Sequence, residues 1–354
     1  MSNQSNFIAA ALILAVALHA GVVGAEGTGL PAAVRAPERL SETGLYRDIS
    51  NGTIAPRNLS FEPQYPLWTD GADKARWIRL PDGATIDVRN TDGWVFPVGT
   101  KLWKEFAFGG KKVETRMLWR ARADQWVFAS YVWNDAQDEA YLAPEVGIRN
   151  HAEIGGGARY SIPSQAECRS CHESGGTPVL GFNALQLSDE RDLLAPHQKP
   201  LKATSLTISR LERFGLLYPR RPDLVENPPR IEARSPRERA VLGYLSANCG
   251  SCHNSRGPLA GLGLFLQHEI GLSSMGVDPA LATSVDVAGQ FVVPGTSRDG
   301  SRRVAPGAPQ ASALVYRMSS RRPSSQMPPL GTGVVDAKAV ELIRAWIAED
   351  LGAK

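Results

Sequence analysis

The sequence predicts an α+β multi-domain protein in which an N-terminal antiparallel β domain, a sandwich or an open barrel, is followed by mostly α-helical modules. The chain has 354 residues, a length that suits about two domains. Seven of the eight tryptophans lie between Trp68 and Trp133, among segments with strand-like patterns. Apolar residues at helical spacing recur in several segments after residue 188, which favours helices there.

The β domain is expected over residues 40–154. Residues 102–108, 113–120 and 126–133 are rich in aromatic and β-branched side chains, and residues 108–113 favour a hairpin turn. Tryptophan clusters can form platforms that bind carbohydrate or apolar ligands, but aromatic side chains more often build a hydrophobic core. We therefore expect these tryptophans to pack in the β domain or against the neighbouring module.

An uncharged, mostly apolar segment at residues 7–25 predicts export. The small residues Gly24 and Ala25 fit the site that a signal peptidase recognises, so residues 1–25 are predicted to be a signal peptide. An uncleaved membrane anchor is the alternative, because 19 uncharged residues nearly suffice to span a bilayer. Both interpretations put the body of the protein outside the cytoplasm, in the periplasm. We expect no stable membrane span after cleavage, and a net charge of only +3 argues against a nucleic-acid partner.

All four cysteines belong to two copies of one motif, C-x-x-C-H. The first copy contains Cys168, Cys171 and His172, and the second contains Cys249, Cys252 and His253. This motif is the attachment signature of c-type haem: two thiols form thioethers to the porphyrin, and the adjacent histidine reaches the iron. A Cys₄ zinc site, two redox-active pairs and structural disulfides are the alternatives, and none of them explains a histidine directly after each pair. The sequence therefore predicts two covalently bound haem c groups.

The second motif lies in a predicted domain of its own at residues 234–354. Ser235 and the following Pro-Arg-Glu form a helix-start pattern, and this helix leads directly into Cys249. Asp336 caps a second predicted helix that runs to Asp350. A helix that enters the haem motif and a closing helix resemble the class I cytochrome c domain, so we expect cytochrome c-like haem modules in the second part of the chain.

The class I resemblance implies a second axial ligand for this haem, usually a methionine on a loop before the last helix. Met327 and the two prolines that follow it occupy that place, and the prolines stiffen the loop. Met318 and Met275 are the alternatives, although a methionine more often fills gaps in a core. We predict Met327 as the ligand.

The first motif is assigned to a smaller helical module at residues 155–217, joined to the next domain by a proline-rich linker at residues 218–233. Helices are expected at residues 188–194 and 205–216. His197 is the preferred distal ligand of this haem because it follows the motif within the same module. A five-coordinate iron without a distal ligand is a further alternative. Four other residues are also alternatives for the distal ligand: His151, His268, Met117 and Met275.

The chain as a whole resembles a family of exported bacterial dihaem c-type cytochromes. The similarity rests on both haem motifs and on short segments at residues 40–46, 65–72, 97–101, 114–116, 131–134 and 327–329. The resemblance implies haem binding and electron transfer in the periplasm, without naming a substrate.

Electron transfer between redox partners is the function that the sequence favours, with a periplasmic dehydrogenase as one donor. A dihaem oxidoreductase with peroxidase-like activity at the first haem and a haem-based ligand-binding or sensor protein are the alternatives. No catalytic residue is assigned. Six arginines between Arg298 and Arg322 predict a positive surface that would attract an acidic redox partner.

Overall fold

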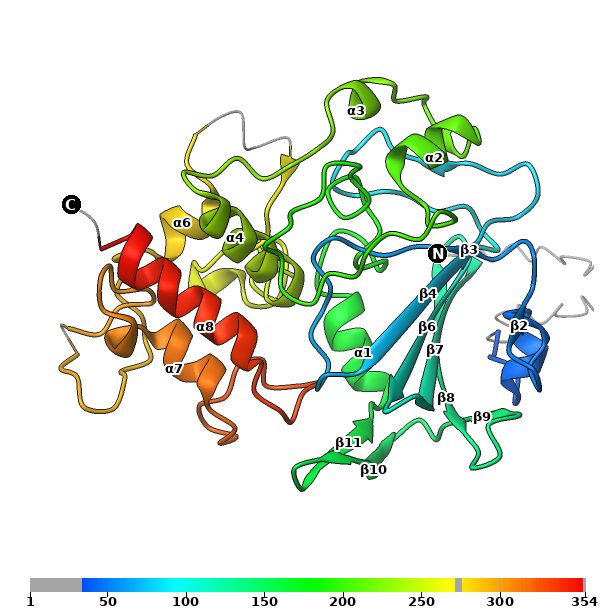
Figure 1. The fold of residues 1–354 in the computed structure, drawn as a ribbon, viewed down its shortest axis with the longest axis horizontal. Helices are drawn as coiled ribbons and strands as arrows, with labels where there is room; N and C mark the ends of the chain where they lie inside the picture. The colour runs from blue at the N-terminus through cyan, green and yellow to red at the C-terminus, as the bar shows by residue number, and fades with distance from the viewer. Residues whose placement is uncertain (1–33, 271–275, 299, 353–354) are drawn as a thin grey trace, which may run out of the picture. The chain divides into compact units, whose positions relative to one another are not determined.

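The computed structural model describes residues 34–270, 276–298 and 300–352. Its largest regular element is a six-stranded sheet in the order β3-β4-β6-β7-β8-β9, in which every neighbouring pair is antiparallel (Figure 1). Its strands are β3 (Leu59–Ser60), β4 (Asp73–Arg79), β6 (Lys101–Phe108), β7 (Lys111–Arg122), β8 (Gln125–Trp133) and β9 (Ala140–Leu142). The strands expected at residues 102–108, 113–120 and 126–133 are therefore confirmed, as is the turn between the first two.

Three two-stranded sheets accompany the large one. Two are antiparallel, β1 (Tyr46–Asp48) with β2 (Thr53–Ile54) and β10 (Ile148–Gly155) with β11 (Ala158–Ile162). The third is parallel and joins β5 (Ile86–Asp87) to β12 (Leu217–Tyr218). This last pairing links residues far apart in the sequence, so the segment after the first motif returns to β5 in the N-terminal part of the chain.

The helices are short. They are α1 (Gln165–His172), α2 (Ile208–Arg213), α3 (Asp223–Glu226), α4 (Pro236–Asn248), α6 (Pro279–Ser284), α7 (Ala313–Ser319) and α8 (Ala337–Ala345). Short 3₁₀ segments lie at η1 (Leu40–Thr43), η2 (Ala260–Leu262) and η3 (Pro309–Ala311), and a π turn, η4 (Trp346–Asp350), continues α8. The expected helices that begin after Ser235 and Asp336 are confirmed, and both of these side chains accept a capping hydrogen bond. Among the described residues no helix is long and apolar enough to cross a bilayer, and the predicted signal peptide lies outside them.

The predicted fold class is wrong, because mostly α-helical cytochrome c-like haem modules do not follow the sheet. Even α4, the longest helix described, has only 13 residues, and turns fill most of the chain between the short helices. The helix expected at residues 188–194 is a series of turns, and the one at 205–216 shrinks to α2. Gly215, with φ of 67°, follows α2 in the left-handed region, where glycine ends helices readily. The strands described form one six-stranded sheet and three two-stranded sheets in place of the expected sandwich or barrel.

Each face of the six-stranded sheet has its own hydrophobic cluster. Trp103, Met117 and Tyr131 are fully buried on one face. Ile78 and Leu102 belong to the other face, where they pack with Phe182 and Leu206 from the segment after the first motif. Six tryptophans belong to or pack against these clusters, as the sequence predicted: Trp77, Trp94, Trp103, Trp119, Trp126 and Trp133.

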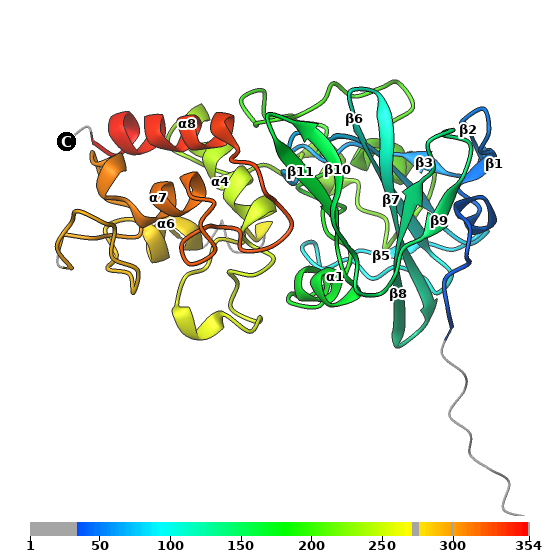
Figure 2. The ribbon, with the colours of Figure 1, turned by 90° about the horizontal axis from the view of Figure 1, so that it is seen from below.

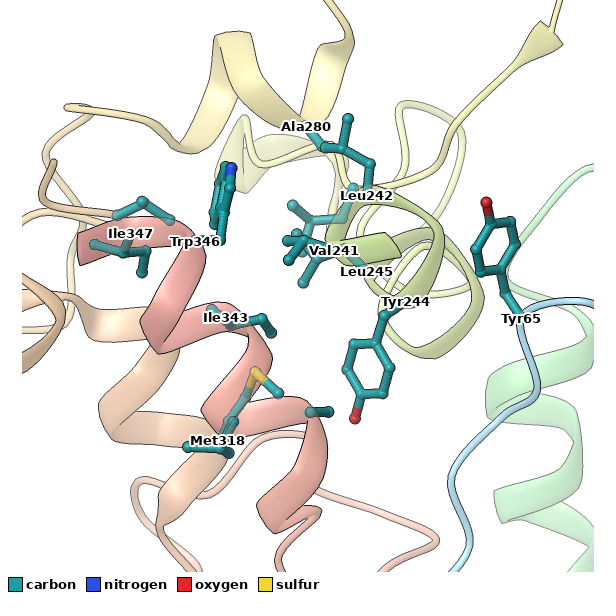
Figure 3. Packing of buried hydrophobic residues seen from close by; sticks show 14 of the residues in the cluster. Tyr65, Val241, Leu242, Tyr244, Leu245, Ala280, Met318, Ile343, Trp346 and Ile347 are labelled. Carbon is teal, nitrogen blue, oxygen red and sulfur yellow. The ribbon is translucent and has the colours of Figure 1, made fainter. Parts of the chain in front are cut away.

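A further cluster joins α4, α7 and α8. Trp346 and Ile343 face Val241 and Leu245 of α4, as Figure 3 shows. The indole Nε1 of Trp346 donates a hydrogen bond to the buried carboxylate of Glu238 at 3.2 Å. A polar anchor of this kind fixes the orientation of the indole within the cluster.

Tyr65 connects the segment before β4 to α4. Its ring packs directly on Gly243, and its hydroxyl lies 3.0 Å from a carboxylate oxygen of Asp192. Figure 3 shows Tyr65 beside α4. A Cβ atom added at Gly243 would lie 2.0 Å from Tyr65 Cε1. The glycine is therefore required by close packing, since a helix interior otherwise favours alanine.

We predict that Gly243→Ala lowers the free energy of unfolding by about 1–3 kcal/mol, the usual cost of overpacking a core. Urea unfolding of the purified protein measures the change. Gly261→Ala is the matched control, because Gly261 is exposed and has nothing within 4 Å of the added Cβ. Equal stability of the two variants would contradict this account of the Tyr65 contact.

Candidate functional site

The first C-x-x-C-H motif is carried by α1. Ser164 caps this helix reciprocally with Glu167: the Ser164 Oγ accepts from the Glu167 amide, and the Glu167 carboxylate accepts from the Ser164 amide at 2.8 Å. Because residues three apart share one face of a helix, Cys168 and Cys171 point to the same side. Figure 2 shows α1 close to β8, and the Gln165 side chain donates to the Phe128 carbonyl at 2.7 Å.

His172 is held in one orientation. Its Nδ1 lies 2.6 Å from the carbonyl oxygen of Pro178, so this nitrogen carries the proton and Nε2 keeps its lone pair. Burial lowers the pKa of His172 to about 4, and the ring packs 5.3 Å from that of Phe128. A neutral imidazole with an oriented ring and a free Nε2 is the state in which histidine binds a metal.

The second motif begins where α4 ends. Cys249 is the C-cap of α4, and the amides of Cys252 and His253 both donate to its carbonyl, at 3.1 and 2.9 Å. Burial, followed by the nearby positive charges of Arg317 and Arg303, lowers the pKa of His253. The neutral form of this histidine is therefore favoured too. Its buried Nδ1 has no hydrogen-bond partner among the described residues.

Asn254 ties the two motifs together. Its side-chain amide donates to the carbonyls of Gly250 and Ser251 in the second motif, both at 3.0 Å, and to that of Ser174 just after the first motif, at 3.3 Å. Gly257 also lets the two segments lie close together, since a Cβ atom at this position would lie 2.5 Å from the Ser174 carbonyl oxygen. The two motifs, 81 residues apart, are therefore neighbours in space.

The thiols of Cys171 and Cys252 lie within hydrogen-bonding reach of each other. The Cys171 thiol donates to Cys252, which lowers the pKa of Cys252 and raises that of Cys171. Burial raises the pKa of Cys249 to about 12, and burial also raises that of Cys168. At neutral pH Cys252 is thus the thiol most readily ionised, and an ionised thiol is the reactive form.

Both motifs open on one cavity of about 700 Å³. This volume falls within the range of small-molecule and cofactor pockets, roughly 300–1,000 Å³. The lining includes all cysteines and histidines of the two motifs together with the predicted ligand Met327: Cys168, Cys171, His172, Cys249, Cys252, His253 and Met327. Apolar side chains from the sheet, from the segment after α1 and from the loop after Met327 complete much of the wall.

The alternative methionines are placed differently. Met318 also lines the cavity but is 6% exposed and packs in the cluster of α4 and α8. The side chain of Met117 belongs to the cluster on the opposite face of the sheet. Met275 lies outside the described residues. Met327 is partly buried, and its amide donates to the Arg317 carbonyl at 3.0 Å, which anchors the loop at the cavity.

Of the three remaining histidines of the described chain, only His268 lines the cavity. His197 Nε2 lies 2.8 and 3.0 Å from the two carboxylate oxygens of Asp336, and its ring packs on Trp68. His151 lies on β10, away from the cavity. The structure therefore does not bring the preferred ligand, His197, to the two motifs.

His268 is buried and oriented by a carboxylate. Its Nδ1 lies 2.6 Å from Asp278 Oδ2, and its Nε2 has no hydrogen-bond partner among the described residues. A histidine whose Nδ1 is paired with a carboxylate and whose Nε2 is unpartnered matches the arrangement of many metal-binding histidines. The sequence showed His268 as one of several alternatives and offered no signal for the partner Asp278.

The residues present fit covalently attached haem. They provide four free thiols in two pairs, a histidine beside each pair, and one cavity that all of them face. In the described parts of the chain, no group of three or more His, Cys, Asp or Glu side chains is arranged to hold a metal ion by itself. Three arginines of the 298–322 segment, Arg303, Arg317 and Arg321, also line the cavity, where each donates to backbone carbonyls and braces a loop.

Comparison of the chain with family models, with curated proteins and with solved structures gave no significant match. Its function is therefore inferred from its own residues and geometry.

We predict that, in chain produced without haem, Cys252 is alkylated by iodoacetamide faster at pH 7 than Cys249. The reason is that the Cys171 thiol stabilises the Cys252 thiolate, whereas burial keeps Cys249 protonated. Peptide mapping by mass spectrometry across a pH series measures both rates. In Cys171→Ala the donor is lost, so the Cys252 rate at pH 7 should fall; an unchanged rate would contradict the thiol contact.

Proposed function

We propose that this chain is an exported dihaem c-type cytochrome that carries electrons between redox partners in the periplasm. The observation that carries the proposal is the opening of two complete C-x-x-C-H motifs on one cavity. When bound, haem supplies an iron that accepts and returns single electrons. The family resemblance of the sequence points to the same class of protein.

The residues of each motif have distinct roles in this proposal. Cys168 with Cys171, and Cys249 with Cys252, would anchor one haem each through thioethers. His172 and His253 would bind the two irons through Nε2, and the Pro178 carbonyl would keep the His172 ring in place. This covalent and axial attachment retains the groups through many cycles of oxidation and reduction.

Met327 remains the proposed second axial ligand of the haem at the second motif. Both methionines line the cavity, but Met318 is also packed in the hydrophobic cluster of α4 and α8, whereas Met327 lies on a loop outside that cluster. A thioether ligand favours ferrous iron and raises the reduction potential, which suits a carrier that accepts electrons from a dehydrogenase.

For the first motif, His268 replaces His197 as the proposed second axial ligand. The Nε2 of His197 already lies within hydrogen-bonding distance of Asp336, and freeing it would cost this buried carboxylate one of its partners. The Nε2 of His268 faces no such competition among the described residues.

We predict that the protein, when exported by a host that matures c-type cytochromes, carries two haems that survive denaturation and acid-acetone extraction. Intact-protein mass spectrometry gives the count. The double variant Cys168→Ala, Cys171→Ala should retain one haem, and Cys249→Ala, Cys252→Ala should retain the other. Wild-type protein with zinc and without haem would overturn the proposed function.

We also predict that His268→Ala creates a high-spin ferric haem that binds carbon monoxide when reduced, because an axial position becomes open. His197→Ala should keep the wild-type spectrum, since it removes the contact with Asp336 and no ligand. Optical spectra of both purified variants make the comparison. A high-spin signal in His197→Ala alone would restore the assignment of His197.

A further inference from the structure

Three basic residues lie side by side across the sheet at the wall of the cavity. Arg76 of β4 is the register partner of Lys104 in β6, and Lys104 is the register partner of Arg116 in β7. All three line the cavity, on the sheet face that also carries Ile78 and Leu102. Like charges placed directly opposite each other on a sheet repel and destabilise it. A row of three such charges therefore calls for compensating negative charge.

Carboxylates of the protein compensate only part of this row. Arg76 pairs with Glu62 at 2.9 Å, and Arg116 pairs with Glu114 at 2.8 Å and donates to the Tyr160 hydroxyl at 3.0 Å. Lys104 forms no ion pair with the described residues; its Nζ lies 4.9 Å from the centre of the Phe106 ring. The row thus has three basic groups and two paired carboxylates, and among the described residues Lys104 is the member without an ion pair of its own.

The surroundings of Lys104 make this deficit costly. Burial and the neighbouring charges of Arg76, Lys74 and Arg116 lower the pKa of Lys104 well below its usual value. Lys74, one step along the same face, adds a fourth basic group whose Nζ donates to the Leu67 carbonyl at 2.9 Å. An anion at the row would remove the repulsion and restore the charge of Lys104.

The row also lies near the first motif. The charges of Arg116 and Lys104 both act on His172, and that of Arg116 acts on Cys168. An anionic group bound at Lys104 would therefore share the cavity with whatever is attached to Cys168 and Cys171.

We propose that Arg76, Lys104 and Arg116 form a carboxylate-binding site on the cavity wall, with Lys104 as the side chain that pairs with the ligand. Two sources of carboxylate fit this chemistry. One is the propionate pair of a haem held by the first motif, and this source rests on the proposed function. The other is a free small dicarboxylate, which the cavity would admit beside the motif.

The test compares the purified holoprotein with Lys104→Met and with Lys111→Met. Lys111 is the matched control because it is an exposed lysine at the start of β7 that pairs with the exposed Asp135. Two properties are measured in each protein. Spectroelectrochemical titration and resonance Raman spectra report the haems and their propionate bending bands, and calorimetry with succinate reports binding of a free dicarboxylate.

If haem propionates occupy the site, Lys104→Met lowers the reduction potential of one haem and shifts one propionate band, and succinate releases no heat. The potential falls because loss of a nearby positive charge stabilises ferric iron. If a free carboxylate occupies the site, wild type binds succinate and Lys104→Met weakens this binding by about tenfold or more, the factor expected for one lost charge-assisted hydrogen bond. Lys111→Met should match wild type in both cases.

The proposal is overturned if Lys104→Met and Lys111→Met have the same potentials, the same Raman bands and no succinate binding that differs between them. Should Lys104→Met fail to accumulate, Lys104→Gln takes its place, and Lys104→Arg, which keeps the charge, should behave as wild type. If the wild-type protein contains no haem, the proposed function fails, but succinate calorimetry on that same protein still decides the site: no binding overturns it, and binding lost in Lys104→Met supports it.

Discussion

The arrangement of the cavity and of the elements around it depends on the contact between the two C-x-x-C-H segments. Asn254 bonds to carbonyls of both segments, Gly257 leaves room for the Ser174 carbonyl, and the thiols of Cys171 and Cys252 meet. Because α1 packs on β8 and α4 packs on α8, this contact also joins the sheet to the cluster around Trp346. One cavity is the geometric result, with a motif on each side of it.

A shared cavity has a functional consequence for the proposed electron carrier. Groups anchored at Cys171 and at Cys252 would occupy the same cavity, so an electron could pass between them within it. The cavity wall also combines apolar residues with basic ones. Apolar residues exclude water, which strengthens the field of every charge within. The row of basic groups formed by Arg76, Lys104 and Arg116 then needs an anion, and the ligand that the cavity holds would supply it.

The sequence predicted which residues meet at the cavity better than it predicted the fold around them. The motif cysteines and histidines, the caps at Ser235 and Asp336, and the central strands follow from local patterns, which is why they could be predicted. The helical modules failed because a few apolar residues at helical spacing do not outweigh the turns and glycines between them. Residues 188–194 illustrate this, since they form turns in which Leu193 and Leu194 are exposed.

The remaining features depend on register and tertiary contacts. Arg76, Lys104 and Arg116 are unremarkable in sequence, and only the pairing of three strands brings them into one row. His197 was preferred as a ligand because it follows the first motif, but Asp336, 139 residues further along the chain, takes its Nε2. His268 is oriented by Asp278, ten residues further along the chain, and no local pattern predicts this contact.

Circular dichroism of the exported holoprotein in the Soret region tests the central claim, two haems held in one cavity, most directly. Two haems in the same cavity should couple electronically, so the account predicts a bisignate Soret couplet. That couplet should disappear in the double variant Cys168→Ala, Cys171→Ala, which retains one haem. A single-signed Soret band equal to the sum of the spectra of the two single-haem variants would contradict the account.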